Sequence, residues 1–265
     1  MFKNYGTCSS VTGHRNLLTP ESIKMLGDNG VEYIEISALQ TLHFDIHNIR
    51  HLESVGRALR KSKLKVWSVH APFTPFAMED RPTREEGIEL AVETCRLVKY
   101  FDFDKIVLHP GSDSLAGDRK RELKNLKDSL KKLVKRTGKM KLALETMGHY
   151  TAGTAAELLE VIKEHDPGKV GACVDTGHTA LVEDVPLAIQ KLKGRIFTVH
   201  IQDNDGKKDL HQLPFTGIID WQKVKNALLE SGYDGVFMYE CGLAGAAPKE
   251  ILRQMRLRYK KIIGL

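Results

Sequence analysis

Residues that can bind a metal or move a proton recur at the ends of short apolar segments along this chain of 265 residues. Each segment is rich in β-branched or aromatic residues and closes on a carboxylate or an imidazole. The closing residues are Glu35, His70, His109, Glu145, Asp175, His200 and Glu240. Imidazole and carboxylate ligands without thiolate suit Zn²⁺, Mn²⁺, Co²⁺ or Fe²⁺. If the segments are parallel strands of one barrel, these side chains meet at one mouth, and the sequence predicts a divalent-metal site there.

Loop residues could join the same site. His178 follows Asp175 by three residues in an Asp-Thr-Gly-His turn that could return its side chain to the mouth. Asp209 and His211 form a D-x-H unit, and in extended backbone both side chains would project to the same side. The connections 71–82 and 202–218 are longer than a tight turn requires, which is typical of functional loops.

Structural roles are the alternative for each of these residues. A single histidine at a strand end is more often a hydrogen-bonded structural residue, and Asp175 or Glu35 could cap the following helix. We expect structural roles for the remaining histidines singled out here, namely His43, His47, His51, His149 and His165. Ligand-type residues at seven strand ends are too consistent for independent caps, so we favour the metal site. Nucleotide-binding glycine motifs, a GxSxG elbow and a strand-end lysine are all missing from the sequence, which disfavours the corresponding chemistries.

The apolar segments alternate with amphipathic segments of helix length, eight times in all. We expect strands over residues 3–8, 31–36, 65–70, 105–109, 140–145, 169–174, 195–201 and 235–240. We expect helices over residues 20–29, 45–62, 82–100, 117–137, 153–165, 183–193, 219–231 and 248–262. This alternation implies parallel strands with crossover helices, and the chain has the usual size of one such barrel. With no linker or low-complexity segment, the sequence predicts the α/β class and a single (β/α)8 TIM barrel over residues 1–265.

Composition and charge narrow the possible functions. No apolar run approaches the roughly 20 residues that cross a bilayer, and the N-terminus lacks the apolar core of a secretion signal, so we expect a cytoplasmic protein without a membrane partner. The four cysteines are scattered singly and are expected to pack as small hydrophobic residues. The net charge of +6 owes much to residues 119–141. We interpret this segment as the solvated face of an outer helix, because no aromatic residues interleave with its charges as in a nucleic-acid platform.

The chain resembles the xylose isomerase-like TIM-barrel superfamily, which contains sugar and sugar-phosphate isomerases and epimerases as well as endonuclease IV. The motifs that carry the resemblance are Val69-His70-Ala71-Pro72, Leu108-His109-Pro110-Gly111-Ser112, Leu144-Glu145-Thr146, Asp175-Thr176-Gly177-His178, His200-Ile201-Gln202-Asp203-Asn204-Asp205-Gly206, Asp209-Leu210-His211 and Tyr239-Glu240-Cys241. Their order and spacing together are specific at the level of the superfamily.

In the keto-sugar epimerase branch, the resemblance implies that Glu145, Asp175, His200 and Glu240 bind one divalent metal. It also implies that Glu145 and Glu240 are the catalytic pair, passing a proton at the carbon beside the sugar carbonyl while the metal polarises that carbonyl. The residues expected around a carbohydrate substrate are Glu35, His70, His109, His178, Asp209 and His211. Glu35 matches no metal position, so we expect it to orient the substrate or a neighbouring ligand.

The endonuclease IV branch offers an alternative with up to three zinc ions and a nucleic-acid partner. The chain has a residue at all of its ligand positions: His70, His109, Glu145, Asp175, His178, His200, Asp209, His211 and Glu240. We favour the sugar branch because the segment 211–221 ends in Ile-Asp-Trp, as loops of that branch often do. In addition, Asp203, Asp205 and Asp209 place negative charge near the mouth, which would repel a phosphate backbone. Phe215-Thr216-Gly217 stands where the family commonly has Gly-Glu-Gly, so the sequence does not identify the sugar or say whether it is phosphorylated. Assembly into a homo-oligomer stays open. A barrel without catalytic activity is a third alternative.

Overall fold

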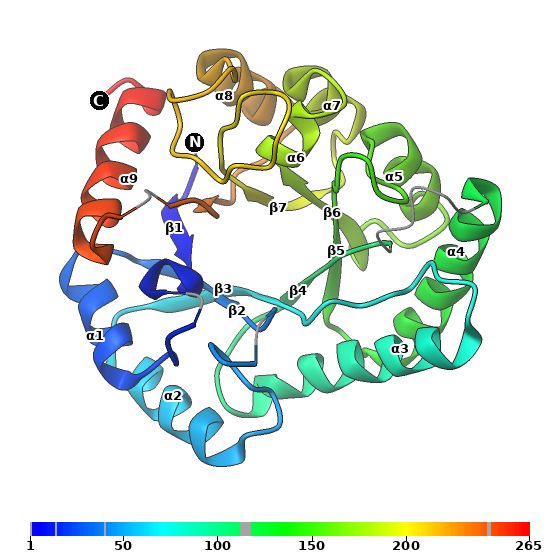
Figure 1. Cartoon of the computed structure of the whole chain (residues 1–265), viewed down its shortest axis with the longest axis horizontal. Coiled ribbons are helices and arrows are strands. Elements are labelled where there is room, and N and C mark those ends of the chain that lie inside the picture. The colour runs from blue at the N-terminus through cyan, green and yellow to red at the C-terminus, as the bar shows by residue number, and fades with distance from the viewer. Residues whose placement is uncertain (1, 14, 40, 112–117, 243–244) are drawn as a thin grey trace.

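The β-branched runs form the inner barrel of the protein. The computed structural model describes residues 2–13, 15–39, 41–111, 118–242 and 245–265 (Figure 1). The strands are β1 (Asn4–Cys8), β2 (Tyr33–Ser37), β3 (Lys65–His70), β4 (Lys105–Leu108), β5 (Lys141–Glu145), β6 (Val170–Asp175), β7 (Ile196–His200) and β8 (Val236–Tyr239). All pairings are parallel, in the order β7-β6-β5-β4-β3-β2-β1-β8. Backbone hydrogen bonds from Ile201 to Met238 and from Glu240 to Ile201 join the two ends, which confirms the predicted barrel.

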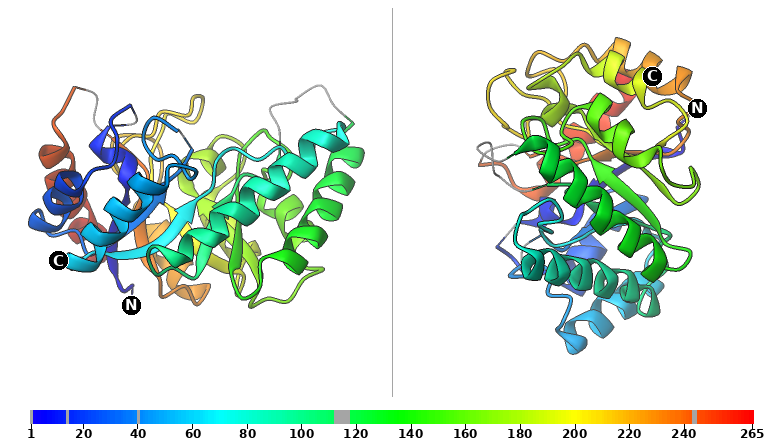
Figure 2. Two further views of the ribbon diagram at one scale, coloured as in Figure 1. Left: turned by 90° about the horizontal axis from the view of Figure 1, so that it is seen from below. Right: turned by 90° about the vertical axis from the view of Figure 1, so that its right-hand side faces the viewer.

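The amphipathic segments form the helices that surround the barrel. They are α1 (Pro20–Asp28), α2 (Ile49–Lys61), α3 (Arg81–Cys95), α4 (Arg119–Arg136), α5 (Ala155–Ile162), α6 (Thr176–Ala180), α7 (Val185–Lys191), α8 (Trp221–Glu230) and α9 (Pro248–Ile263), with 3-10 turns η1 (Ser9–Thr12) and η2 (Arg96–Lys99). Figure 2 shows the long loops gathered at one end of the barrel and the N-terminus at the other. Within the described residues, no helix is both long and apolar enough to cross a bilayer.

Most helix starts follow local capping chemistry. Thr19 and Thr154 accept hydrogen bonds from backbone N–H groups three residues later and begin α1 and α5, close to the starts expected for the helices over 20–29 and 153–165. The expected helix 45–62 begins only at Ile49, because Asn48 caps it through the N–H of His51. The expected helix over 117–137 begins at Arg119, and residue 117 lies outside the described part of the chain.

Two register shifts in the sheet align residues at the mouth. The first, between Ile34 and Glu35, places Glu35 opposite Ser68 of β3. The second, between Ala172 and Cys173, places Asp175 opposite His200. A one-residue change of register moves a side chain to the other face of a sheet. These shifts therefore help to determine which side chains of β2 and β6 point into the barrel.

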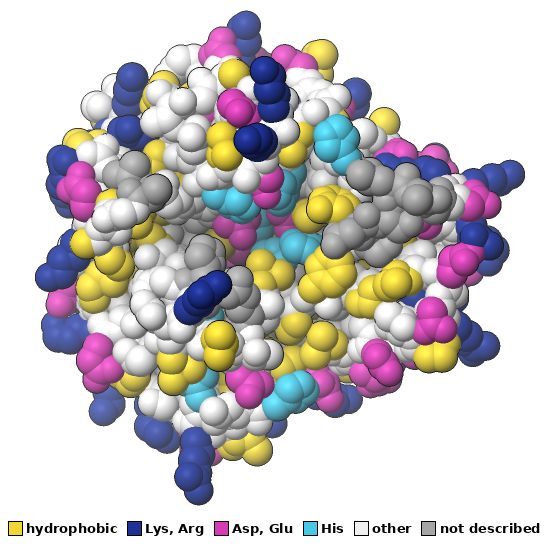
Figure 3. Space-filling model, in the orientation of Figure 1, with side chains coloured by type: hydrophobic (Ala, Val, Ile, Leu, Met, Phe, Trp, Pro, Cys, Tyr) yellow, Lys and Arg dark blue, Asp and Glu magenta, His cyan; other side chains and the backbone are white. Residues whose placement is uncertain are grey.

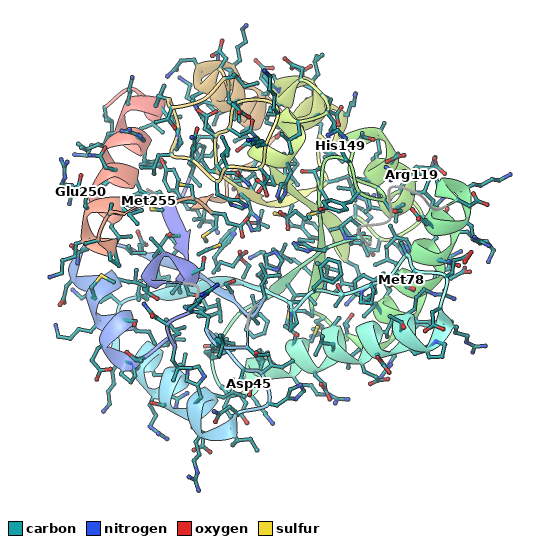
Figure 4. The ribbon with its side chains drawn as sticks, in the orientation of Figure 1. Asp45, Met78, Arg119, His149, Glu250 and Met255 are labelled. Atoms are coloured by element: carbon teal, nitrogen blue, oxygen red, sulfur yellow. The ribbon has the colours of Figure 1, made fainter. Side chains whose placement is uncertain are left out.

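The basic helix α4 is held by acidic residues of α3, of α5 and of the turn that follows α5. Arg119, at the start of α4 (Figure 4), donates through Nε to Glu157 at 2.9 Å. Lys127 Nζ lies 2.9 Å from Glu164, and Arg136 Nη2 donates to Glu89 at 2.7 Å. Lys132 pairs with Glu85 as well. Leu126, Leu130 and Leu133 form the buried side of the helix. The structure thus supports the interpretation of this segment as an outer helix, and much of its positive charge is compensated.

Candidate active site

A cavity of about 370 Å³ opens at the carboxyl end of the barrel, among the loops that follow the strands. Figure 3 shows histidine and acidic side chains gathered at the bottom of this hollow. Its polar wall consists of His109, Glu145, His178, Asp209, His211 and Glu240, with His149 beside them. A wider cavity of about 810 Å³ lies at the opposite end of the barrel, lined by Trp67 and several lysines. We place the functional site at the smaller cavity, because the potential metal ligands converge there.

The centre of the site is a four-residue cluster from β5, β6, β7 and the end of β8. Glu145, Asp175, His200 and Glu240 each present one ligand atom, and these atoms lie within 4.8 Å of one another. Nδ1 of His200 is 2.8 Å from Glu240 Oε2 and 3.2 Å from Glu145 Oε1. Asp175 is more distant, at 3.9 Å from the same nitrogen. The central cluster therefore combines one imidazole with three carboxylates, a donor set that suits a divalent transition metal.

Two outer groups of side chains flank this central cluster. In the first, Nε2 of His70 and Nε2 of His109 lie 3.1 and 3.3 Å from the same Glu145 oxygen. In the second, His178 and His211 approach Asp209 Oδ2 at 3.2 and 3.1 Å. Each trio also has its ligand atoms within 4.8 Å of one another. The structure thus brings together all nine residues that the sequence marked as potential ligands, in three groups, with Glu145 shared by two of them.

The buried carboxylates carry strongly perturbed pKa values. Burial raises the pKa of Asp175 to about 6, and the charges of Glu145 and Glu240 add to this effect. Burial acts in the same direction on Glu240, but the nearby His200 outweighs it and holds the pKa at about 2. Burial likewise opposes ionisation of Glu145, whereas the histidines around it hold its pKa well below the usual range. Three carboxylates in one buried cluster repel one another, and a divalent cation would relieve that repulsion.

The histidines of the second outer group have raised pKa values. Burial favours neutral His211, but its hydrogen bond to Asp209 and the charges of Glu240 and Asp175 raise its pKa to about 9. The pKa of His178 lies well above its ordinary value, because Asp175, Asp209 and Glu145 together outweigh the effect of burial. At neutral pH these shifts favour the protonated imidazoles, and a metal bound at this outer group would have to displace a proton.

Glu35 lies deeper than the cavity. It is within β2 rather than at its end, and its side chain is fully buried. Its carboxylate accepts hydrogen bonds from Ser68 Oγ at 2.6 Å and Cys8 Sγ at 3.0 Å, and it is 2.9 Å from His200 Nε2. Of the two roles expected for Glu35, contact with a neighbouring potential ligand agrees with this position. Cys8 differs from the expectation of simple packing, because its thiol donates a hydrogen bond.

The D-x-H unit has a different backbone from the expected one. His211 adopts a left-handed conformation with φ of 46°, not an extended one. Paired hydrogen bonds between Asp203 and Gln212 turn the loop back on itself, and His211 Nδ1 is 2.8 Å from the carbonyl oxygen of Glu240. This turned loop, rather than strand-like alternation, is what brings His211 next to Asp209.

Asp203 contributes to the loop rather than to the charge of the mouth. Its side chain is fully buried and accepts hydrogen bonds from Trp221 Nε1 at 3.0 Å and from the backbone N–H groups of Asn204 and Ile219. Asp205 accepts from the N–H groups of the two following lysines. Of the three aspartates expected to repel a phosphate backbone, only Asp209 lines the cavity. That expectation is therefore wrong for Asp203.

Residues that the sequence analysis did not assign to the site complete the wall. His149, expected to be structural, lines the cavity from the loop after β5 (Figure 4), and Tyr150 lies beside it. The apolar part of the wall consists of Leu39, Met147 and Leu181. Proximity in sequence to Glu145 was the only available indication for the loop residues. By contrast, His43 and His51 have the expected structural roles, since His43 lies 2.9 Å from Ser9 Oγ and His51 contacts the carbonyl oxygen of Leu18.

Cationic side chains are missing from the described wall of the cavity. None of the described residues that line it is Lys or Arg. The undescribed positions 1, 14, 40, 112–117 and 243–244, which include Ser112 of the expected motif, carry neither residue type. The wall as described thus offers carboxylates, imidazoles, a phenol and apolar surface, but no fixed cation for a phosphate group.

Comparisons with known proteins agree with this architecture. A family model described as "Xylose isomerase-like TIM barrel" matches residues 23–261. Among curated proteins, apurinic-apyrimidinic endonuclease 1 of Saccharomyces cerevisiae is 33% identical over 111 residues, which cover 40% of this chain and 30% of that protein. A relative from Sinorhizobium fredii is 28% identical over 185 residues, which cover 62% of this chain and 58% of the relative. The chain therefore matches only part of the length of these two relatives.

Solved structures match over almost the whole chain. A D-tagatose 3-epimerase-like protein has a TM-score of 0.83 and is 22% identical, with 98% of both chains covered. The IolI protein, whose structure has a bound zinc atom, has a TM-score of 0.85 and is 19% identical, again with 98% of both chains covered. At these identities, the likeness shows the shared fold.

Proposed function

The chain belongs to the xylose isomerase-like TIM barrel family, and on this premise we propose that it is a divalent-metal-dependent isomerase or epimerase of a sugar without a phosphate group. The observation that carries the proposal is the buried cluster of Glu145, Asp175, His200 and Glu240 beneath a cavity with no lysine or arginine in its described wall. The epimerase-like and zinc-bound structures of the same fold support it.

The central cluster has the ligands that such an enzyme requires. Glu145, Asp175, His200 and Glu240 would hold the metal, which supplies charge stabilisation at a sugar carbonyl when bound. The unusual concentration of buried carboxylates fits a cation at this position. Of the four residues, Glu145 and Glu240 also line the cavity and can therefore reach a substrate.

Glu145 and Glu240 would transfer the proton. Both have pKa values below their ordinary range, so both are ionised at neutral pH and either can accept a proton from the carbon beside the carbonyl. Return of a proton by the other carboxylate inverts that carbon, whereas its return to the neighbouring carbon isomerises the sugar. Leu39, Met147 and Leu181 would contact the apolar face of the sugar ring or chain and keep water from the reacting carbon.

Proton exchange with solvent tests this proposal. Metal-loaded protein is incubated in heavy water with a panel of free ketoses and their phosphates, and deuterium on carbon is measured by mass spectrometry and NMR. We expect incorporation beside the carbonyl of a free ketose, and its loss in Glu145→Gln and Glu240→Gln. The exposed variant Glu160→Gln serves as a matched control and should behave as wild type. No incorporation with any ketose would contradict the proposal.

A second candidate function is cleavage of DNA at abasic sites. It is favoured by the three groups of ligands around Glu145 and by the partial match to the yeast endonuclease. The compensated charges of α4 and the lack of cations in the described cavity wall count against it, because phosphate contacts dominate binding to DNA. A gel assay on a duplex with one abasic site, with zinc or manganese present, decides between the two: an intact strand removes this candidate.

A further inference from the structure

His200 is the one residue of the central cluster that can bind a metal through nitrogen, and its ring is held from both sides. Nδ1 faces the cavity side, at 2.8 Å from Glu240 and 3.2 Å from Glu145. Nε2 faces the barrel interior, at 2.9 Å from Glu35 Oε1. An ionised carboxylate only accepts hydrogen bonds. The contact with Glu35 therefore requires a proton on Nε2. A proton on Nδ1 is held by Glu240 and Glu145, and a metal that displaces it would meet the Nδ1 lone pair.

Glu35 is itself fixed by two donors from neighbouring strands. Ser68 Oγ donates to Oε2 at 2.6 Å, and Cys8 Sγ donates to Oε1 at 3.0 Å. β1 places Cys8 opposite Glu35, and the register shift between Ile34 and Glu35 places Ser68 opposite it on the other side. With these partners, the carboxylate has a defined orientation in the fully buried interior.

The other histidines are anchored differently. Nδ1 of His70 lies 3.0 Å from the carbonyl oxygen of Ala71, and Nδ1 of His211 lies 2.8 Å from that of Glu240. These contacts direct Nε2 of both rings toward the site, whereas His200 is directed through Nδ1. Unlike His70 and His211, His200 has its second nitrogen against a carboxylate that does not line the cavity.

We propose that Glu35, held by Ser68 and Cys8, is a positioning residue that fixes the ring orientation and the Nε2–H tautomer of His200 so that Nδ1 can bind the metal. The inference rests on the proposed metal site but not on the identity of the substrate. Carboxylates behind metal-binding histidines fix the tautomer and increase the basicity of the ligand. Glutamine at position 35 could instead donate its amide N–H to Nε2, which would move the proton to Nδ1 and block the metal.

A competing arrangement is that Cys8, Glu35 and His200 Nε2 bind a cation of their own. Their ligand atoms also lie within 4.8 Å of one another. The separations of 2.9 and 3.0 Å match hydrogen bonds, and all three side chains are nearly or fully buried without a place in the cavity wall. These observations favour the hydrogen-bonded arrangement, and the number of bound metals distinguishes the two.

The first test measures zinc affinity by competition with a chelator and zinc stoichiometry at saturation. Glu35→Gln should weaken binding by roughly 10- to 100-fold, with the same stoichiometry and an unchanged circular dichroism spectrum. Ser68→Ala and Cys8→Ala should weaken it less. Their matched controls are Ser129→Ala and Cys95→Ala, which alter buried residues in α4 and α3 and should leave affinity unchanged. Unchanged affinity in Glu35→Gln, or loss of one metal equivalent at saturation, would overturn the proposal.

The second test uses the metal-free protein, so it does not depend on metal binding or on activity. Nitrogen NMR of histidine-labelled protein at high pH, assigned with His200→Asn, reports which nitrogen of His200 carries the proton. We expect Nε2 to carry a proton in wild type, with or without a second proton on Nδ1 beside Glu240, and to lose it in part in Glu35→Gln. If Glu35→Gln does not fold, Ser68→Ala replaces it, with a smaller loss expected. A wild-type ring protonated on Nδ1 alone contradicts the inference even if sugar turnover is found, whereas absence of turnover leaves it intact.

Discussion

Binding of a further metal at the outer group of His178, Asp209 and His211, beside the one held by the central cluster, should strengthen steeply as the pH rises from 7 to 9. The perturbation is the pH alone, applied to the outer group of His178, Asp209 and His211. A metal can bind these imidazoles only after their protons leave. With a pKa of about 9 for His211, proton competition at pH 7 should weaken binding to this residue by about 100-fold. The His211 side chain is 39% exposed, so solvent screening should reduce the effect to roughly tenfold or a few tens.

The stability of the metal-free protein should change in the opposite direction. Because the folded-state pKa of His211 is raised, its stabilising contribution is complete below its ordinary pKa and is lost as the pH rises toward 9. Asp175, with its raised pKa of about 6, also lowers stability as the pH rises from about 4 to 6, because ionisation of this buried carboxyl is unfavourable. Between pH 6.5 and 9, the apo protein should therefore lose stability while its apparent metal affinity increases.

Two measurements check this pair of expectations. Calorimetric titration with Mn²⁺, in buffers of different ionisation enthalpy, gives both the affinity and the number of protons released. Chemical denaturation of the metal-free protein at the same pH values gives its stability. Metal affinity that is constant or falls between pH 7 and 9, or binding without proton release, would refute the reasoning about His178 and His211.

Other predictions concern the loop and the basic helix. Asp203→Asn should destabilise the protein by about 2–4 kcal/mol, because a buried charged acceptor loses strength toward several donors, whereas Asp205→Asn should change stability by about 0.5 kcal/mol or less; urea denaturation compares them, and equal effects would contradict the role of Asp203. Gly217→Ala should disorder the loop 202–218, because a Cβ there would lie 2.0 Å from the backbone oxygen of Asn204. Since this loop carries Asp209 and His211, metal affinity should fall; an affinity equal to that of wild type would show that the loop adapts. Lys127→Ala should cost about 1 kcal/mol or less at low salt, as expected for a surface ion pair, and a uniform loss at all salt concentrations would argue against an electrostatic cause.

The barrel and the convergence of its strand ends were predictable from sequence. Hydrophobic segments of strand length that alternate with amphipathic helices leave few other topologies. In a parallel barrel, carboxyl ends of strands meet at the same mouth, so His70, Glu145, Asp175 and His200 had to be near one another. Their grouping required no knowledge of loops or of side-chain packing.

The errors have a common physical cause in long-range contacts. Glu35 is positioned by a register shift between β2 and β3 and by two donors from the neighbouring strands, Ser68 and Cys8. No local sequence pattern therefore indicates that Glu35 lies beneath His200. Asp203 is held by Trp221, which lies 18 residues further along the chain at the start of α8. The left-handed conformation of His211 depends on the turned backbone of that loop. Sequence periodicity does not report such contacts.

The central claim is that Glu145, Asp175, His200 and Glu240 hold a divalent metal at the mouth of the barrel. Elemental analysis of wild-type protein and of Glu145→Gln, after loading with metal and removal of the excess, tests it most directly. We expect at least one tightly bound divalent metal per wild-type chain and a marked loss in Glu145→Gln, with Glu160→Gln unchanged. A wild-type protein that retains no metal, or a Glu145→Gln variant that retains all of it, would contradict the claim.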